Sequence, residues 1–334
     1  MIFRPILPQE LDAVLSYIQP DSSTMLSADV VRSRLADGEY RPEWIWVAEA
    51  GPGRAPLLLA IWWGMPGDAY PRSLDGLFST AASSVLTGPD ARTFPPSQPS
   101  GDPRIATTAA LLTAAHQVFA ADGLTALPEY HLFLPPSWRD QPETAAAVKW
   151  RREASKAAGL RVVTERLRFE WTAEGPVPSV SERLVFTPEP DDEVFVDLLR
   201  RTLPGSLDAA TTREALLVGP EEQARNDVAF YRHDMLGERS WWRIARMSTG
   251  QVVGFGIPSR NSNTSVVGYL GVLPEFRGRG FVAEILAEIT RVLATEAKET
   301  VVRADTDLTN HPMIAAFELL GYNEIARRLV LSAG

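Results

Sequence analysis

The stretch that decides the fold is "GYLGVLPEFRGRGFVAEILAEI", residues 268–289. An apolar run ends at Pro274, two glycines set among arginines follow, and apolar residues then recur at the spacing of one helix face. That face consists of Val282, Ile285, Leu286, Ile289, Val292 and Leu293. The stretch therefore predicts a strand, a glycine-rich loop and a helix that begins near Phe281.

The glycine-rich loop has the composition of an anion-binding site. Gly278 and Gly280 permit positive φ and let a ligand approach the backbone closely. The first N–H groups of the following helix have no partner within it, and the helix dipole favours negative charge there. Arg277 and Arg279 add positive charge. We therefore expect the loop to bind a phosphate; the alternative is a structural turn with solvated arginines.

Three other ligand classes fit the loop less well. Residues 278–283 match the dinucleotide pattern G-x-G-x-x-G/A, and Asp305 lies at a suitable distance for a ribose contact. However, residues 273–277 separate the strand from the first glycine, and too little chain follows for further βα units. The sequence has no G-x-x-x-x-G-K-[ST] segment of a P-loop. An RNA-binding RGG segment would be low in complexity, whereas this loop lies between patterned elements. A dinucleotide-dependent enzyme remains the weakest alternative.

Composition limits the remaining possibilities. The 334 residues suggest two domains of ordinary size, and the net charge of -9 disfavours nucleic acid and anionic membranes as partners. No window approaches the ~20 apolar residues of a membrane span, and we find no signal peptide, so we expect a cytoplasmic protein. The absence of cysteine excludes disulfides and a cysteine nucleophile, and the scattered histidines give no metal site.

The two halves of the chain repeat one order of patterns. A strand ending in F-x-P and an amphipathic helix begin at Phe3 and again at Phe186. A tryptophan-led hairpin pattern follows in each half. Later, a helix ends at Gly159 and at Gly321, and a strand follows each time. These repeats favour a diverged duplication, although two unrelated α+β domains would share much of the layout.

The segment at residues 271–286 resembles the acetyl-CoA-binding segment of the GNAT superfamily of N-acetyltransferases. The family pattern is a V-x-P strand end, then [QR]-x-x-G-x-[GA], then a long helix. Here Val272 to Pro274 and Arg277 to Val282 occupy those positions, with valine at 282 where the family has glycine or alanine. The resemblance is specific over 264–334 and plausible from 184, and the first half resembles the family in layout only.

The resemblance implies an α+β fold of the three-layer α/β kind, made of two tandem GNAT-like domains. Each would be a mixed, mainly antiparallel twisted sheet flanked by helices. Residues 1–172 would form a degenerate domain without the CoA-binding loop, 173–183 a linker, and 184–334 the domain that binds acetyl-CoA. The cofactor-binding residues would be Leu270, Val272, Arg277, Gly278, Arg279, Gly280, Phe281, Val282, Asn310 and Phe317.

The implied activity is transfer of an acetyl group from acetyl-CoA to an amine by direct attack. Such attack forms no covalent intermediate, so the lack of cysteine is no obstacle. The acceptor could be a small molecule or a peptide. The alternative is a catalytically inactive protein that senses CoA or acyl-CoA, or serves as a subunit of an assembly. A fused pair of domains can mimic the dimer of single-domain relatives, so we expect a monomer or a homodimer.

Candidate catalytic residues follow from the resemblance and from strand alternation. Phe317 stands where many family members have the tyrosine that protonates the leaving thiolate, so Tyr269 is the candidate acid. On the next strand Asp305 and Asp307 share a face with Arg303. Asp305 is the first candidate for the general base and Asp307 the second. The alternative for each is pairing with Arg303 or exposure to solvent.

Overall fold

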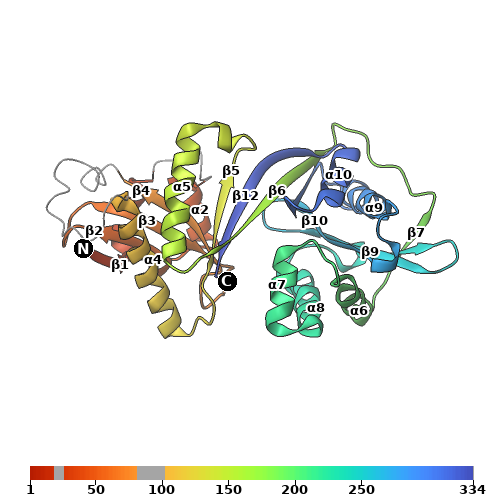
Figure 1. Ribbon diagram of the computed structural model, residues 1–334, viewed down its shortest axis with the longest axis horizontal. Coiled ribbons are helices and arrows are strands. Elements are labelled where there is room, and N and C mark those ends of the chain that lie inside the picture. The colour runs from red at the N-terminus through yellow and green to blue at the C-terminus, as the bar shows by residue number, and fades with distance from the viewer. Residues whose placement is uncertain (19–25, 81–101, 334) are drawn as a thin grey trace. The chain divides into compact units, whose positions relative to one another are not determined.

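The computed structural model describes residues 1–18, 26–80 and 102–333 of the chain. These residues form two compact units (Figure 1). Unit 1 comprises Met1–Glu165 and Arg327–Gly334, and unit 2 comprises Arg166–Ala326. Residues 81–101 contain most of the proline-rich stretch that replaces the glycine loop in the first half, and they lie outside the described residues.

Unit 1 is a mixed sheet with helices on both faces. Its strands are β1 (Ile2–Pro5), β2 (Ile45–Glu49), β3 (Pro56–Trp63), β4 (Ser73–Ser79), β5 (Glu129–Leu134) and β12 (Asn323–Ser332), and its helices include α1 (Leu11–Leu15), α2 (Ala28–Ala36), α4 (Pro103–Asp122) and α5 (Pro142–Ala157). The strands lie in the order β1-β2-β3-β4-β5-β12. All neighbours are antiparallel except β4 and β5, which pair in parallel.

The strand β3 shows why both faces of this sheet carry helices. Its sequence PLLLAIWW is apolar at every position, as expected for a strand that is buried on both sides. Leu58 and Trp62 pack in a cluster with residues of α4 and α5, whereas Leu59 and Ile61 pack with residues of α1 and α2. The alternation of side chains along the strand thus supplies two separate cores.

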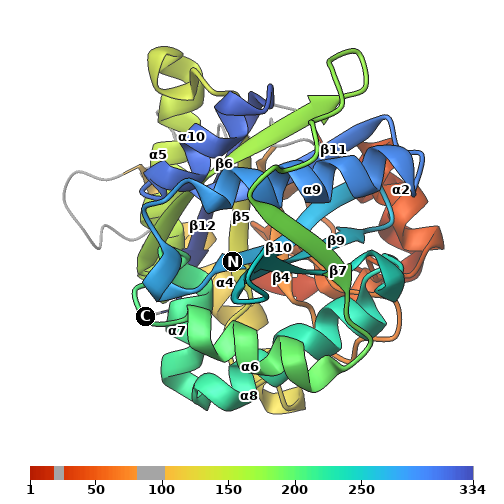
Figure 2. The same ribbon diagram turned by 90° about the vertical axis from the view of Figure 1, so that its right-hand side faces the viewer.

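Unit 2 repeats this arrangement. Its strands are β6 (Val162–Thr172), β7 (Leu184–Pro188), β8 (Arg243–Met247), β9 (Val252–Arg260), β10 (Ser265–Val272) and β11 (Val301–Asp307), and its helices include α6 (Asp192–Thr202), α7 (Ala209–Val218), α8 (Pro220–Ala229), α9 (Phe281–Thr295) and α10 (His311–Leu319). The order is β7-β8-β9-β10-β11-β6, with β10 and β11 parallel. Figure 2 shows α6, α7 and α8 on one side of this sheet and α9 on the other.

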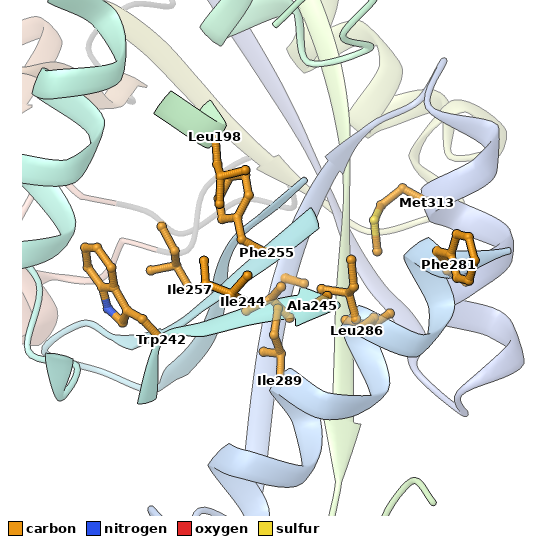
Figure 3. Packing of buried hydrophobic residues seen from close by; sticks show 14 of the residues in the cluster. Leu198, Trp242, Ile244, Ala245, Phe255, Ile257, Phe281, Leu286, Ile289 and Met313 are labelled. Atoms are coloured by element: carbon orange, nitrogen blue, oxygen red, sulfur yellow. The ribbon is translucent and has the colours of Figure 1, made fainter. Parts of the chain in front are cut away.

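Two glycines of β9 bring α9 close to the sheet. A Cβ at Gly256 would lie 2.8 Å from Ile289 Cγ1, and one at Gly254 would lie 3.0 Å from Ile285 Cδ1. On the opposite face Phe255 packs against the α6 side of the core. Figure 3 shows Phe255 pointing toward Leu198, away from Ile289 of α9. The helix predicted from residue 281 therefore forms and buries the predicted face.

The structural division differs from the expected boundaries of 1–172 and 184–334 because each half contributes its last strand to the other unit. The second part of β6 pairs with β11, from Thr172 opposite Val301 to Arg166 opposite Asp307. Conversely, β12 pairs with β5 of unit 1. Residues 173–183 connect β6 to β7 without a helix or strand. Within the described ranges, no helix is both long and apolar enough to cross a membrane.

His116 of α4 makes the stability of unit 1 depend on pH. It is 5% exposed, and its ring packs edge-on against Trp62. Both ring nitrogens are buried without a hydrogen-bond partner in the described residues. Burial lowers the pKa of His116 from 6.5 to about 4. The histidine is therefore neutral in the folded state, and its protonation in the unfolded state opposes folding in acid.

We predict that His116→Leu becomes more stable relative to the wild type as pH falls from about 6.5 to 4. The unfolded histidine gains its proton near its ordinary pKa, so the cost to the wild type grows to roughly 3 kcal/mol across that window. Thermal unfolding of both proteins at pH 7.5 and pH 4.5 measures the difference. The exposed His233, changed to leucine, is the control; equal pH dependence of the wild type and His116→Leu would contradict the prediction.

Candidate functional site

The glycine loop forms an uncapped helix start. It follows β10 through the short helix η8 (Pro274–Phe276) and ends at Gly280, the residue that precedes α9. Gly278 and Gly280 have φ of 75° and 79°, a conformation that favours glycine. Gly280 supplies no side-chain cap to α9. The first N–H groups of α9 therefore point out of the helix end, as an anion-binding site requires.

The two loop arginines have different surroundings. Arg277 donates to three backbone carbonyls, those of Val272 at 3.1 Å, Pro204 at 2.6 Å and Thr202 at 2.5 Å. Its guanidinium therefore ties the loop to the end of β10 and to the segment after α6. Arg279 is exposed and donates to the Glu275 carbonyl at 3.1 Å. Arg279 is thus the better placed of the two to meet a phosphate, and Arg277 shapes the loop.

The strand before the loop has an open edge. β10 pairs in parallel with β11 at Ser265 and Val266, yet continues to Val272. A bulge lies between Val266 and Tyr269, at Gly268, whose φ is 70° and where a Cβ would lie 2.1 Å from the Ile257 carbonyl oxygen. Beyond this bulge, β10 diverges from β11 while it remains paired with β9.

The direction of the free backbone groups follows from strand alternation. The N–H of Leu273 donates to the Val253 carbonyl at 2.9 Å, so position 273 faces β9. Backbone groups alternate in direction along an antiparallel strand. Leu270 and Val272 therefore face the diverging edge. Arg277 already donates to the Val272 carbonyl, so an extended ligand could add main-chain hydrogen bonds at Leu270 and at the Val272 N–H.

Asp305 and Asp307, the predicted candidates for the base, lie in a ladder of cross-strand ion pairs. Asp305 receives two hydrogen bonds from Arg168, at 2.8 and 3.0 Å. Asp307 is 3% exposed, lies 3.4 Å from Arg166 and accepts the Ala209 N–H at 2.7 Å. Carboxylates held in this way are less available to take a proton from an amine. The pairing favours a structural role for both.

Arg303 of β11 completes this ladder, and its partner lies on β6, the strand that also carries Arg166 and Arg168. The sequence offered it as the partner of Asp305 or Asp307, but it donates to Glu170 at 2.8 Å. The three ion pairs thus join β11 to β6 on one face of the sheet. On the other face Leu167 and Phe169 of β6 enter the core of unit 2.

Three further residues of the predicted site have defined positions. Tyr269 packs its ring on Phe255, with centroids 6.0 Å apart, at the bulge of β10. Asn310 accepts from the Met313 N–H at 3.4 Å and so caps α10. Phe317 is 2% exposed and stacks on Phe169 at 4.8 Å. Its side chain belongs to the core, so any contribution to a cofactor pocket is through shape.

Of the loop residues, Phe281 and Val282 contribute mainly their backbone. The ring of Phe281 is 6% exposed and packs in the core of unit 2, beneath the guanidinium of Arg183. Val282 is half-buried against the same core. Their side chains secure the start of α9 while the N–H groups remain at the helix end.

Sequence reasoning missed a polar cluster on the side of β10 that faces α7 and α8. Gln223, Asp227 and Tyr231 are spaced four residues apart and so lie on one helical face. Ala224 and Val228, next to them, are buried in the core. The sequence did contain a signal for this cluster: its polar residues recur at i, i+4 and i+8 beside apolar residues of the buried helix face.

Burial dominates the electrostatics of this polar cluster. Burial raises the pKa of Asp227 to about 7, the Gln223 hydrogen bond opposes this rise, and the carboxylates of Glu214 and Asp208 add to it. Burial also raises the pKa of Tyr269, and the charges of Asp208 and Asp227 raise it further. A carboxyl that titrates near neutrality beside a strand with an open edge is a candidate functional group.

Two cavities lie in unit 1. One of about 290 Å³ is lined by Phe78, Arg104, Trp150 and Arg151, among others. Another of about 390 Å³ lies along α5. Among the described residues, no group of three or more histidine, aspartate or glutamate side chains could hold a metal ion. The candidate site in unit 2 is defined by its glycine loop and open strand edge.

Comparison with known proteins supports the fold. Residues 209–322 match the family model described as the acetyltransferase (GNAT) family, so the C-terminal region contains a GNAT domain. A GCN5-related N-acetyltransferase from Sphaerobacter thermophilus is 16% identical, with a TM-score of 0.52 over 98% of this chain and 94% of that one. No curated protein matches the chain.

Two other solved structures are similar. One is a GCN5-related glucosamine N-acetyltransferase region in a fungal multi-domain GH3 β-N-acetylglucosaminidase, with 14% identity, a TM-score of 0.55, and coverage of 98% of this chain and 38% of that one. The other is a tandem GNAT protein from the clavulanic acid biosynthesis pathway, with 19% identity, a TM-score of 0.47, and coverage of 100% and 98%. At these identities the likeness concerns the fold alone. The expected α+β fold with GNAT-like architecture is confirmed.

We predict that Asp305→Asn lowers the free energy of unfolding by about 1–3 kcal/mol, because it removes the negative charge that pairs with Arg168 across the two strands. CoA affinity should remain within about threefold, a change of under 1 kcal/mol. Chemical denaturation and calorimetric titration with CoA measure the two effects. The exposed Glu318, changed to glutamine, is the control.

The exchanged pair, Arg168→Asp with Asp305→Arg, tests the cause of this loss. It should recover part of the stability, because it restores opposite charges across the two strands. A fully stable Asp305→Asn protein would refute the structural role of the ion pair.

Proposed function

We propose that this protein is an acyl-CoA-dependent N-acetyltransferase that transfers an acetyl group from acetyl-CoA to an amine acceptor in a ternary complex. The observation that carries the proposal is the continuity of two features of unit 2. The uncapped start of α9 at Gly280 suits a pyrophosphate, and the diverging edge of β10 at Leu270 and Val272 suits an extended amide-containing arm. CoA contains both groups in that order, ending in the thioester.

The same positions in unit 1 are occupied by the protein's own side chains. The helix α4 begins with Pro103, which has no N–H, and is capped by Asp102, whose carboxylate accepts the Arg104 N–H at 3.0 Å. A carboxylate at this helix end takes the position an anion would need. These features support a single CoA site per chain, in unit 2.

At the strand edge of unit 1, a side chain of the same unit already hydrogen-bonds the backbone. The N–H of Thr80 donates to Leu57, as that of Leu273 does to Val253, so Leu77 of β4 corresponds to Leu270 of β10. In unit 1 the carbonyl of Leu77 accepts from Arg151 Nε at 3.0 Å. The buried guanidinium thus holds the edge that the corresponding strand of unit 2 leaves open.

Turnover distinguishes the enzyme from a CoA-binding sensor. The test is thiol release from acetyl-CoA with a panel of primary amines, including benzylamine and amino-acid esters. Glucosamine belongs in the panel because one fold relative is described as a glucosamine N-acetyltransferase region. Amine-dependent thiol release would support the proposal, whereas CoA binding without thiol release for any amine would favour a sensor.

We predict that Gly280→Asp weakens CoA binding at least ~100-fold, about 2.7 kcal/mol or more. The change puts a side chain at a φ of 79° and a carboxylate at the helix end that should bind pyrophosphate. Calorimetric titration with CoA gives the affinity and should give one site per wild-type chain. Gly250→Asp, at a turn glycine with φ of 85° and open space around it, is the matched control.

Two results would contradict the site assignment. One is an unchanged affinity in a folded Gly280→Asp protein. The other is a stoichiometry of two in the wild type, which would mean that unit 1 binds CoA despite Asp102 and Arg151.

A further inference from the structure

Two buried acceptor atoms on α8 lack donors. Gln223 is 3% exposed, and its Nε2 donates to Asp227 Oδ1 at 3.0 Å. The remaining oxygen of each side chain, Gln223 Oε1 and Asp227 Oδ2, is buried and has no hydrogen-bond partner within residues 1–18, 26–80 and 102–333. Buried acceptors without donors are costly in a folded protein and call for an explanation. A ligand with several N–H donors would satisfy both at once.

The charges around these two acceptors favour a cation. The titratable and charged groups that act on Asp227, or on the tyrosines beside it, are Asp208 at the start of α7, Glu214 of α7, Tyr231 after α8, Tyr269 of β10, Arg166 of β6 and Arg277 of the glycine loop. The guanidinium of Arg166 is shared between Asp208 and Asp307, each at 3.4 Å. Its charge is thus matched by acids other than Asp227. Arg277 acts on Tyr269, whereas the charged groups that act on Asp227 itself are the acids Glu214 and Asp208.

The α7–α8 pair is fixed to the strands at the point where they diverge. The N–H of Ala209, the first residue of α7, donates to Asp307 at the end of β11. Thr211 hydrogen-bonds Tyr269 at the bulge of β10. The helix α8 then continues into a π-helical turn, η6 (Phe230–Asp234), that carries Tyr231. Such turns occur frequently at functional sites.

We propose that Asp227, positioned by Gln223, binds the ammonium group of the acceptor and takes its proton, so that the acceptor is a cationic amine approaching from the α7–α8 side of unit 2. This inference rests on the proposed acetyltransferase function and deepens it by naming the acceptor class. The donor would lie along the free edge of β10. The acceptor would approach that strand from the side of the sheet that carries α7 and α8. Tyr269 lies at the bulge of the same strand.

The proton balance of the reaction is simple. The ammonium gives one proton to the Asp227 carboxylate and becomes a neutral amine, whose nitrogen forms a bond to the thioester carbonyl carbon. The carbon–sulfur bond then breaks, and the sulfur leaves with its electron pair as a thiolate. The nitrogen's surplus proton passes to the thiolate, and Asp227 returns its proton to water. A carboxyl whose pKa lies near neutrality suits this task, because it is partly ionised and accepts a proton readily.

Asp227→Asn is the direct test. With benzylamine as acceptor and saturating acetyl-CoA, we expect kcat/KM to fall at least ~100-fold, as for loss of a general base. The wild-type profile should rise with pH and bend near 7, and the variant should lose this bend while keeping the rise that reflects the amine's own deprotonation. CoA affinity should not change. Glu222→Gln, at an exposed position of the same helix, is the matched control.

Gln223→Leu separates positioning from general structural damage. The Gln223 hydrogen bond lowers the pKa of Asp227, so its removal should move the bend in the profile to higher pH. Asp227→Glu should restore part of the activity that Asp227→Asn loses. A folded Asp227→Asn protein with a rate within about threefold of the wild type and the same bend, under 1 kcal/mol in barrier, would overturn the proposal.

A binding measurement decides the case in which the wild type binds acetyl-CoA but releases no thiol with any amine. That result would count against the proposed function alone. Titration of the full chain with benzylammonium at pH 8, with benzyl alcohol as the neutral control, then tests the cation site. Saturable binding of benzylammonium only, abolished by Asp227→Asn, supports the site; no binding, or binding unaffected by the substitution, overturns it.

Discussion

The pairing of β6 with β11 is the constraint on which unit 2 depends. The two strands run antiparallel from Val301 opposite Thr172 to Asp307 opposite Arg166, whereas β10 meets β11 only at Ser265 and Val266 within the described residues. One face of the β6–β11 pair carries complementary charges and the other carries core side chains. β6 holds β11 along its length, and β10 diverges from β11 beyond the bulge at Gly268. The free edge that suits an extended ligand follows from this unequal pairing.

The charge ladder also fixes register. A slip of one residue would turn every charge of β6 into the core and every apolar side chain out of it. Opposite charges directly across an antiparallel pair stabilise it, and like charges destabilise it. Glu170 faces Arg303 while Arg168 faces Asp305, so the sign reverses along both strands together. A strand from the first half is thereby specified for the sheet of the second.

The parts of this structure that the sequence predicted are those set by local rules. The positive φ of Gly278 and Gly280 and the spacing of apolar residues in α9 act over a few residues. They predicted the loop, the helix and the resemblance that indicated the fold. The partner of Asp305 lies 137 residues earlier in the chain, so no local pattern could show that the carboxylate is paired. The exchange of β6 and β12 was missed for the same reason.

The Asp227 cluster was only partly predictable from the sequence. Its helical spacing is visible in the sequence, but its chemistry depends on which helix face meets the sheet, and tertiary packing decides that. A fully solvated Asp227 would have an ordinary pKa, and a deeply buried one with only acidic neighbours would stay protonated. The hydrogen bond from Gln223 opposes the effects of burial, Asp208 and Glu214 and holds the pKa near neutrality.

Units 1 and 2 show how one architecture supports two different roles. In unit 2 the proposed donor site consists of backbone groups at Gly280 and Leu270. Because such a site depends on backbone conformation, one charged side chain would be enough to block it. Unit 1 has such side chains in Asp102 and Arg151, which satisfy the corresponding helix end and strand edge internally. The proposed acceptor side of unit 2 consists instead of side chains on α7 and α8. If the proposal holds, substitutions on those helices would change acceptor choice without disturbing the glycine loop that follows β10.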